Sequence, residues 1–310
     1  MPTAISGGSR IRTNTPAEQA YNALQSASSN IALRQLRLST GKRINSAADD
    51  VAGYITSRAL KSRTGALKSA LNSVGEANSV TSISMDALDN INSLLTQIKD
   101  SAATASSGAL GTDEKVALAK GAYRLSQQIQ FVVDSTVFGG KQLLQGGFSG
   151  DWTIGYLANN NLLTMGVDLT TGNTELNVTS NDFNINSKNA SAFAGVAGFN
   201  LSCLNSVSSS DLGVFASSQI SSTLTSLSDA LSNVNKVASY LGGLQVRLNS
   251  QEDLLKSQIT NYNAAVSRIE DADVATEQLD LVKSQFLQQA SLISLAQANQ
   301  NPQSFLQLFR

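Results

Sequence analysis

The sequence contains no histidine and a single cysteine, Cys203, so the residues that most enzymes and metal sites rely on are scarce. Histidine is the commonest general base and the commonest metal ligand, and its absence disfavours acid–base catalysis and histidine-ligated metals. One cysteine cannot form a disulfide within the chain or a cysteine metal cluster. We therefore interpret Cys203 as a small buried apolar residue, and we expect neither enzymatic activity nor a cofactor.

The chain of 310 residues has only three prolines. Aromatic residues make up 5% of it and charged residues 15%. Hydrophobic residues reach 41% and are mostly Ala, Leu, Val and Ile, which suits thin helical bundles better than a thick globular core. A net charge of -1 provides no basic surface for nucleic acid. The sequence contains no run of ~18 apolar residues that could span a bilayer. Residues 1–16 lack the apolar core of a secretory signal peptide. We expect neither nucleic acid nor membrane as a partner.

Apolar residues recur at three-, four- and seven-residue steps near both ends of the chain. Such a stripe requires a partner helix, because an isolated helix would leave its apolar face in water. We therefore expect the two ends to pair and the middle of the chain to loop out. The stripes consist of Ala17, Leu24, Ile31 and Leu38; of Val234, Val237, Leu241, Leu244, Leu248, Leu255, Ile259, Tyr262, Val266 and Ile269; and of Leu279, Val282, Phe286, Ala290 and Ile293.

Between these ends the pattern predicts two more helices and a β-hairpin. A capping box formed by Ser46 and Asp49 predicts a helix from about Ala47 to Ser106, and Thr112 opens another helix. Alternating apolar residues between Trp152 and Leu169 predict the hairpin. The helical pattern resumes near 220, and an unbroken helix of ~50 residues would be ~75 Å long, too long for a compact globule. The fold class we expect is mainly α: an elongated helical rod or coiled-coil bundle with a small β-hairpin and a rudimentary outer segment.

Several motifs in the same order give the chain a specific resemblance to a known family. Residues 38–53 read LSTGKRINSAADDVAG and closely resemble bacterial flagellin, the subunit of the flagellar filament. Residues 138–144 (FGGKQLL) are similar to the family segment that precedes its β-hairpin. The C-terminal segments SRIEDAD (267–273), QANQ (297–300) and LFR (308–310) also resemble flagellin.

The resemblance implies three regions and a structural function. Residues 1–50 with 270–310 would form the inner terminal helices, 51–186 with 220–269 a bundle with the hairpin, and 187–219 a short variable surface segment. The chain would be exported unfolded and self-assemble outside the cell into a filament for swimming. Implied partners are other copies of itself or other flagellins, the filament cap, hook-junction proteins and an export chaperone. The runner-up is a hook–filament junction protein; an intracellular coiled-coil scaffold is the alternative from another class.

Candidate interface residues come from the stripes and from two charged connectors. Arg43, Asp49 and Asp50 can form ion pairs that fix the packing of neighbouring subunits, although the two aspartates can also simply favour a helix N-terminus. The acidic residues Glu270, Asp271 and Asp273 lie at the matching C-terminal connector and lack the surroundings of a calcium loop. The full set of subunit-interface candidates is Leu24, Ile31, Leu38, Arg43, Asp49, Asp50, Ile269, Asp273, Leu279, Val282, Phe286, Ile293, Phe305 and Leu308.

A phosphate-binding interpretation of Gly139-Gly140-Lys141 fails, because the preceding glycine is missing and Gln142 stands where a Ser or Thr is required. Two surface features remain. Many animal-associated flagellins carry an Arg-Val-Arg-Glu-Leu motif that an innate immune receptor recognises; the matching positions here are Gln97, Ile98, Lys99, Asp100 and Ser101. Asn177, Asn189 and Asn200 match the N-linked acceptor pattern, and Ser and Thr within 170–219 offer sites for O-linked sugars; an unmodified intact mass of the native subunit would exclude glycans there.

Overall fold

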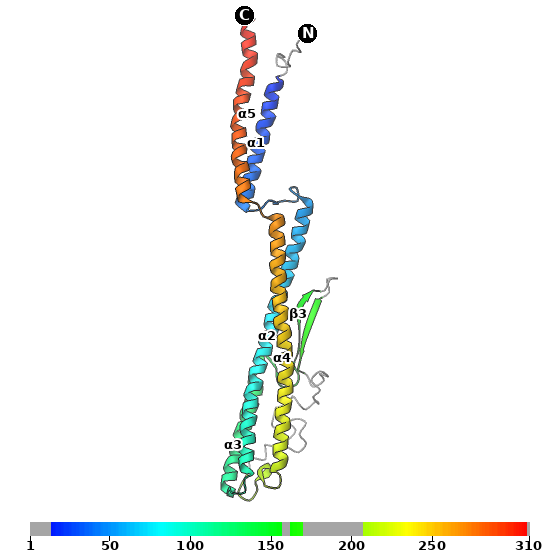
Figure 1. Cartoon of the computed structure of the whole chain (residues 1–310), viewed down its shortest axis with the longest axis vertical. Helices are drawn as coiled ribbons and strands as arrows, with labels where there is room; N and C mark the ends of the chain where they lie inside the picture. The colour runs from blue at the N-terminus through cyan, green and yellow to red at the C-terminus, as the bar shows by residue number, and fades with distance from the viewer. Residues whose placement is uncertain (1–13, 157–161, 170–206, 309–310) are drawn as a thin grey trace. The chain divides into compact units, whose positions relative to one another are not determined.

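The computed structural model describes residues 14–156, 162–169 and 207–308, and Figure 1 shows the order of their elements. The chain divides into two compact units: unit 1 comprises the chain up to Gly65 together with Thr260 onward, and unit 2 comprises Ala66–Ile259. Helices and a small amount of antiparallel sheet make up both the expected and the observed secondary structure, so the predicted mainly helical class is confirmed. In the part of the chain that the structure describes, no helix is long and apolar enough to cross a bilayer.

Helix α1 (Thr15–Thr40) begins and ends where its local sequence requires. The side chain of Asn14 accepts a hydrogen bond from the backbone amide of Ala17 at 3.2 Å, which caps the first turn. A proline in that first turn costs no helical hydrogen bond. Gly41 terminates the helix with φ of 68°, a left-handed conformation that glycine adopts without steric cost.

Helix α2 (Val51–Ala105) begins later than the capping-box interpretation predicted. The carboxylate of Asp49 accepts hydrogen bonds from the backbone amides of Asn45 (2.9 Å) and Ser46 (2.8 Å), so it stabilises a turn before the helix. Asp50 instead accepts from the amide of Gly53 at 3.0 Å. The predicted start at Ala47 is therefore wrong, because the first aspartate holds the turn and the second caps the helix.

Helix α5 (Val274–Leu308) packs against α1 within unit 1, which confirms that the two ends of the chain pair. Figure 1 shows the two helices side by side. The pairing face of α1 centres on buried Ala20 and Ala27, with the predicted stripe half-buried beside it. On α5 the expected face is wrong: Leu281 and Ala298 are buried, whereas the predicted stripe is exposed. Apolar residues occur on both faces of α5, so spacing alone did not identify the one that meets α1.

Unit 2 contains the larger core, built mainly by α2 and by α4 (Ile220–Glu270). Helix α3 (Thr112–Ser135) adds a buried face that includes Ala119, Ala122, Ile129 and Val133. The stripes predicted for α2 and for the first part of α4 are confirmed. Their buried members are Val80, Ala87, Ile91, Leu94 and Ile98 on α2, and Val234, Val237, Leu241, Leu244, Leu248 and Leu255 on α4.

Two antiparallel hairpins follow α3. Strands β1 (Val137–Phe138) and β2 (Lys141–Gln142) are joined by two glycines with φ of 57° and 81°, so the Gly139-Gly140-Lys141 segment is a tight turn. Strands β3 (Ser149–Tyr156) and β4 (Leu162–Asp168) form the predicted hairpin, with Trp152 opposite Met165. A bulge at Ile154 frees its carbonyl oxygen, which accepts a 2.9 Å hydrogen bond from Gln251 of α4. A short 3-10 helix, η3 (Gly213–Phe215), precedes α4.

Candidate functional site

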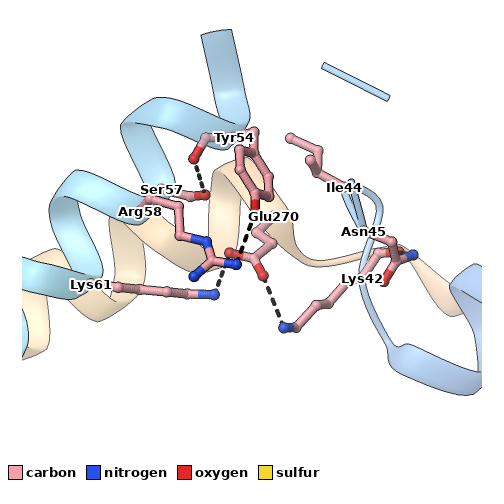
Figure 2. A pocket seen from close by; sticks show the side chains of 8 residues that line it. All are labelled: Lys42, Ile44, Asn45, Tyr54, Ser57, Arg58, Lys61 and Glu270. Carbon is pink, nitrogen blue, oxygen red and sulfur yellow. Dashed lines mark hydrogen bonds and ion pairs between the residues drawn. The ribbon is translucent and has the colours of Figure 1, made fainter. Parts of the chain in front are cut away.

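Glu270, the last residue of α4, is the centre of a charged network in unit 1. Its carboxylate lies 3.0 Å from Nζ of Lys42 and 2.5 Å from Nζ of Lys61, although the Glu270 side chain is only 8% exposed. Figure 2 shows both lysines directed at this carboxylate, one from the connector after α1 and one from α2. A single buried carboxylate therefore joins three segments that are far apart in the sequence.

Backbone hydrogen bonds hold the same connectors together. The amide of Arg43 donates to the carbonyl oxygen of Glu270 at 2.6 Å, and the amide of Ala272 donates to that of Gly41 at 2.9 Å. The Arg43 guanidinium adds a 2.7 Å hydrogen bond to the carbonyl oxygen of Ile269. Because these bonds fix backbone to backbone, the two connectors form one ordered joint.

Beside this joint lies a pocket of about 210 Å³, lined by Lys42, Arg58 and Lys61 together with Glu270 and uncharged side chains. Arg58 donates to the hydroxyl oxygen of Tyr54 at 2.9 Å, and its guanidinium carbon lies 5.1 Å from the centre of the Tyr54 ring. The lining combines charged and hydroxyl groups without a nucleophile paired with a base, so it offers no catalytic arrangement. Among the described residues, no group of three or more His, Cys, Asp or Glu could hold a metal ion.

A second carboxylate, Glu277, ties α5 to α1. It accepts a 2.7 Å hydrogen bond from Arg34 and a 3.2 Å hydrogen bond from Arg37, and its side chain is 7% exposed. Arg34 also lies 3.2 Å from the carboxylate of Asp280. Arg34 continues the seven-residue spacing of Ala20 and Ala27 along α1, so an ion pair replaces small apolar contacts at the end of this seam.

The environment of these carboxylates favours their charged forms. For both Glu270 and Glu277 burial alone would raise the pKa, but the paired cations outweigh it and lower the pKa. For Glu270 the cations are Lys61 and Lys42, and for Glu277 they are Arg34 and Arg37. Each network is therefore an ionised cluster at neutral pH, suited to holding structure together.

The remaining charged candidates mostly organise local backbone. Hydrogen bonds from the amides of Ser46 and Asn45 lower the pKa of Asp49, and the Thr276 hydroxyl and nearby amides lower that of Asp273, which caps α5. Asp50 lies 4.0 Å from the Arg43 guanidinium. The joint thus brings Arg43, Asp50 and Ile269 together, as part of one chain.

The most exposed apolar surface of unit 1 is the outer face of α5. Leu279 is 73% exposed, Phe286 72% and Ile293 71%, and Val282 is 47% exposed. We call these four residues the α5 outer stripe. Large apolar side chains at this exposure lack the stabilisation that burial would give them, which makes this row a candidate contact surface.

Sequence reasoning missed Arg34, Arg37, Lys61 and Glu277, which make ion pairs between segments far apart in the sequence. The one sequence signal for these ion pairs is that Arg34 continues the seven-residue spacing of Ala20 and Ala27 on the pairing face of α1. The other candidates are placed as follows: Gln97 and Asp100 are exposed and Lys99 and Ser101 half-buried on α2, the backbones of Phe305 and Leu308 lie in α5, and Asn177, Asn189, Asn200 and Cys203 lie outside the described residues.

These features together define a helical structural protein with paired chain ends and an uncovered apolar face. Comparison with known proteins identifies its family. The model of the bacterial flagellin N-terminal helical region matches residues 11–149, and that of the bacterial flagellin C-terminal helical region matches residues 224–309. The chain therefore belongs to the bacterial flagellin family, whose members are structural proteins of the flagellar filament and not enzymes.

Individual relatives match this chain over nearly their whole length. The chain is 28% identical to a flagellin of Bacillus subtilis, over 97% of this chain and 100% of the relative. It is 27% identical to flagellin B of Vibrio anguillarum, over 96% and 98%. A putative flagellar hook-associated protein of Vibrio parahaemolyticus matches in structure with a TM-score of 0.54 at 14% identity, covering 72% of this chain and all of that one, which is a similarity of fold.

Proposed function

We propose that this chain polymerises into the extracellular flagellar filament by burying the α5 outer stripe against neighbouring subunits. The exposure of Leu279, Phe286 and Ile293 is the observation that carries this proposal. Burying a large apolar side chain contributes about 1.5–3 kcal/mol, so the four residues of the stripe together supply several kcal/mol per subunit. Contacts of this size, repeated along a polymer, are enough to offset the entropy of fixing each subunit.

The other interface candidates extend this proposal. Arg43, Asp49 and Asp50 would contact the next subunit from the joint, in addition to their roles within the chain. The paired terminal helices of 1–50 and 270–310 would form the inner region, 51–186 with 220–269 the bundle, and 187–219 the variable outer surface. The remaining proposed contacts are Leu24, Ile31, Leu38, Ile269, Asp273, Phe305 and Leu308.

We further propose that the terminal segments fold fully only on assembly. A helix with an uncovered apolar face is stabilised mainly by packing, so an isolated subunit gains less from ordering its ends than a subunit within a polymer. Partly unfolded ends would suit export through a narrow channel with the help of a chaperone. At the growing tip the subunit would then meet the filament cap. At the base of the filament it would meet hook-junction proteins.

The first experiment is electron microscopy of purified protein after seeding with short filament fragments. Long tubes of constant diameter are expected. Failure to grow under every seeding condition, with the monomer intact, would instead favour a hook–filament junction protein. An intracellular scaffold would show fully ordered termini in the isolated subunit by hydrogen exchange, whereas the proposed subunit exchanges rapidly at both ends.

Substitution of the outer stripe tests the interface directly. We expect Phe286→Ala with Ile293→Ala to slow seeded growth at least about tenfold, because truncating two exposed anchors removes about 3 kcal/mol of interface burial. Gln285→Ala with Gln289→Ala is the matched control, since both glutamines are exposed on the same helix. Pelleting assays measure the polymer formed; equal growth of the two variants would rule out the stripe as the interface.

Recognition by the innate immune receptor is expected to be weak. Gln97 and Lys99 replace the two arginines of the motif, so the guanidinium forks are missing, and Ser101 replaces the leucine anchor. Signalling by purified monomer in receptor-expressing cells measures this, with Gln97→Arg/Lys99→Arg/Ser101→Leu expected to raise the response. Full-strength signalling by the unmodified chain would contradict the prediction.

A further inference from the structure

Three pairs of polar side chains join α2 and α4 within unit 2. Nδ2 of Asn78 donates to Oδ1 of Asn249 at 3.1 Å, and Nδ2 of Asn92 donates to Oδ1 of Asn235 at 2.9 Å. Between them, Nε2 of Gln245 donates to the hydroxyl oxygen of Ser82 at 3.2 Å. We call these six residues the α2–α4 ladder.

All three pairs belong to one antiparallel register. Asn92 follows Asn78 by 14 residues on α2, and Asn235 precedes Asn249 by 14 residues on α4. Ser82 follows Asn78 by four residues, and Gln245 precedes Asn249 by four. Fourteen residues are two heptads, so the asparagine pairs recur in every second heptad of the helix pair.

The apolar core repeats twice as often as the asparagine pairs. Buried residues recur every seven positions on both helices, so a slip of one heptad would still place apolar faces against each other. The core therefore distinguishes poorly between the observed register and its neighbours. The repeating residues are Leu67, Val74, Thr81, Leu88 and Leu95 on α2, and Leu227, Val234, Leu241, Leu248 and Leu255 on α4.

The α2–α4 ladder does distinguish the observed register from registers slipped by one heptad. In the observed register Met85 and Gly242 occupy the heptad between the two asparagine pairs, and a β-carbon added at Gly242 would meet no atom within 4 Å. A slip of seven residues in either direction sets Asn78 or Asn92 against Gly242 and breaks both asparagine pairs. Oδ1 of Asn78 is already shielded from solvent and has no hydrogen-bond partner among the described residues. A displaced register would also remove the bond from Nδ2 of Asn78 to Asn249, so the amide of this half-buried residue would lose its contact with α4.

We propose that the α2–α4 ladder sets the register of the two long helices, so that every subunit presents the same bundle surface. The asparagines contribute through the penalty on displaced registers more than through the strength of their own hydrogen bonds. The proposal concerns the single chain, so its outcome is independent of how, or whether, the subunits polymerise.

Pulsed electron paramagnetic resonance on the full-length monomer tests the register. Spin labels are placed at Asp86→Cys on α2 and Arg247→Cys on α4, both exposed positions outside the ladder, with Cys203→Ser so that only introduced thiols are labelled. A one-heptad slip moves α4 by ~10.5 Å along α2. The unsubstituted ladder should give one distance, and Asn78→Ala with Asn92→Ala should add a second population displaced by up to ~10 Å.

Asn72→Ala with Asn90→Ala is the matched control, because it removes two exposed asparagines from the same helix and should keep the single distance. If the double ladder variant fails to fold, Asn92→Ala alone keeps one asparagine pair and should give a smaller displaced population. A single, unbroadened native distance in the folded ladder variants would overturn the proposal. In that case connections such as Gln251 to Ile154 set the register.

Discussion

Removal of residues 281–310 is expected to abolish polymerisation while leaving a soluble monomer. The deletion removes Leu281, which is buried in the pairing of α5 with α1, and also Phe286 and Ile293 of the outer stripe. Helix α1 then has only the first turns of α5 as a partner, and neighbouring subunits lose the apolar face that we propose they bind. Seeded growth followed by sedimentation and electron microscopy measures the result; no pelletable tubes are expected.

The truncated monomer should keep unit 2 intact, because Ala66–Ile259 contains its own core. Limited proteolysis provides the control: a resistant fragment of unit 2 should survive equally in the truncated and full-length chains. If the truncated chain forms normal tubes, residues 281–308 of α5 are dispensable and the proposed mechanism fails. If unit 2 itself becomes protease-sensitive, the loss of growth reflects misfolding.

The sequence predicted the helices of this fold well because their stripes are long and regular. On α2, residues such as Val80, Ala87 and Ile91 form a regular apolar series that is also the buried one, so spacing and burial agree. The hairpin was predictable for the same reason, since Met165, Val167 and Leu169 alternate with more exposed residues and are buried. The pairing of the two chain ends was predictable because each end carries an apolar stripe that requires a partner helix.

Helix α5 shows where periodicity stops being informative. Leu281 faces α1, whereas Leu279 and Val282 point outward, so two apolar series run along one helix. A chain that pairs within itself on one face and with its neighbours on another needs both series. Spacing therefore predicted correctly that α5 pairs with the other end of the chain, and could not say which of its two apolar series meets α1.

The joint was only partly predictable, because several of its bonds link residues with no sequence signal. Glu270 was visible as part of an acidic triplet, yet its partner Lys61 lies on α2 among other exposed charges. Backbone hydrogen bonds, such as the one from the Arg43 amide to the Glu270 carbonyl oxygen, leave no trace in side-chain identity. Contacts of this kind depend on the path of the backbone.

Acid is expected to dissociate filaments of this protein, and Glu277→Gln should both weaken them at neutral pH and reduce their response to acid. The folded-state pKa of Glu277 is lowered by Arg34 and Arg37 against the opposing effect of burial. A carboxylate with a lowered pKa adds stability that is fully present above its ordinary pKa of about 4.3 and is lost as the pH falls through the folded value. Glu270 acts in the same direction through Lys61 and Lys42.

The size of the effect follows from the burial of the pair. Glu277 is 7% exposed and its arginines 24% and 17%, so removing the charge leaves two partly desolvated guanidinium groups without their carboxylate. We expect a loss of about 3 kcal/mol at pH 7, the lower end for breaking a buried pair. The control is Glu252→Gln, which breaks an i,i+4 pair with the 57%-exposed Lys256 and should cost less than about 0.5 kcal/mol.

Light scattering during thermal dissociation of filaments, at pH 7 and at stepwise lower pH, separates the two variants. The dissociation temperature of Glu277→Gln filaments should be well below that of Glu252→Gln filaments at pH 7, and the two should converge in acid, because protonation removes the same charge that the substitution removed. Equal dissociation temperatures at neutral pH would show that the Glu277 cluster contributes nothing net. A difference in dissociation temperature that persists unchanged in acid would mean that the substitution destabilises the filament through altered packing and not through the lost charge.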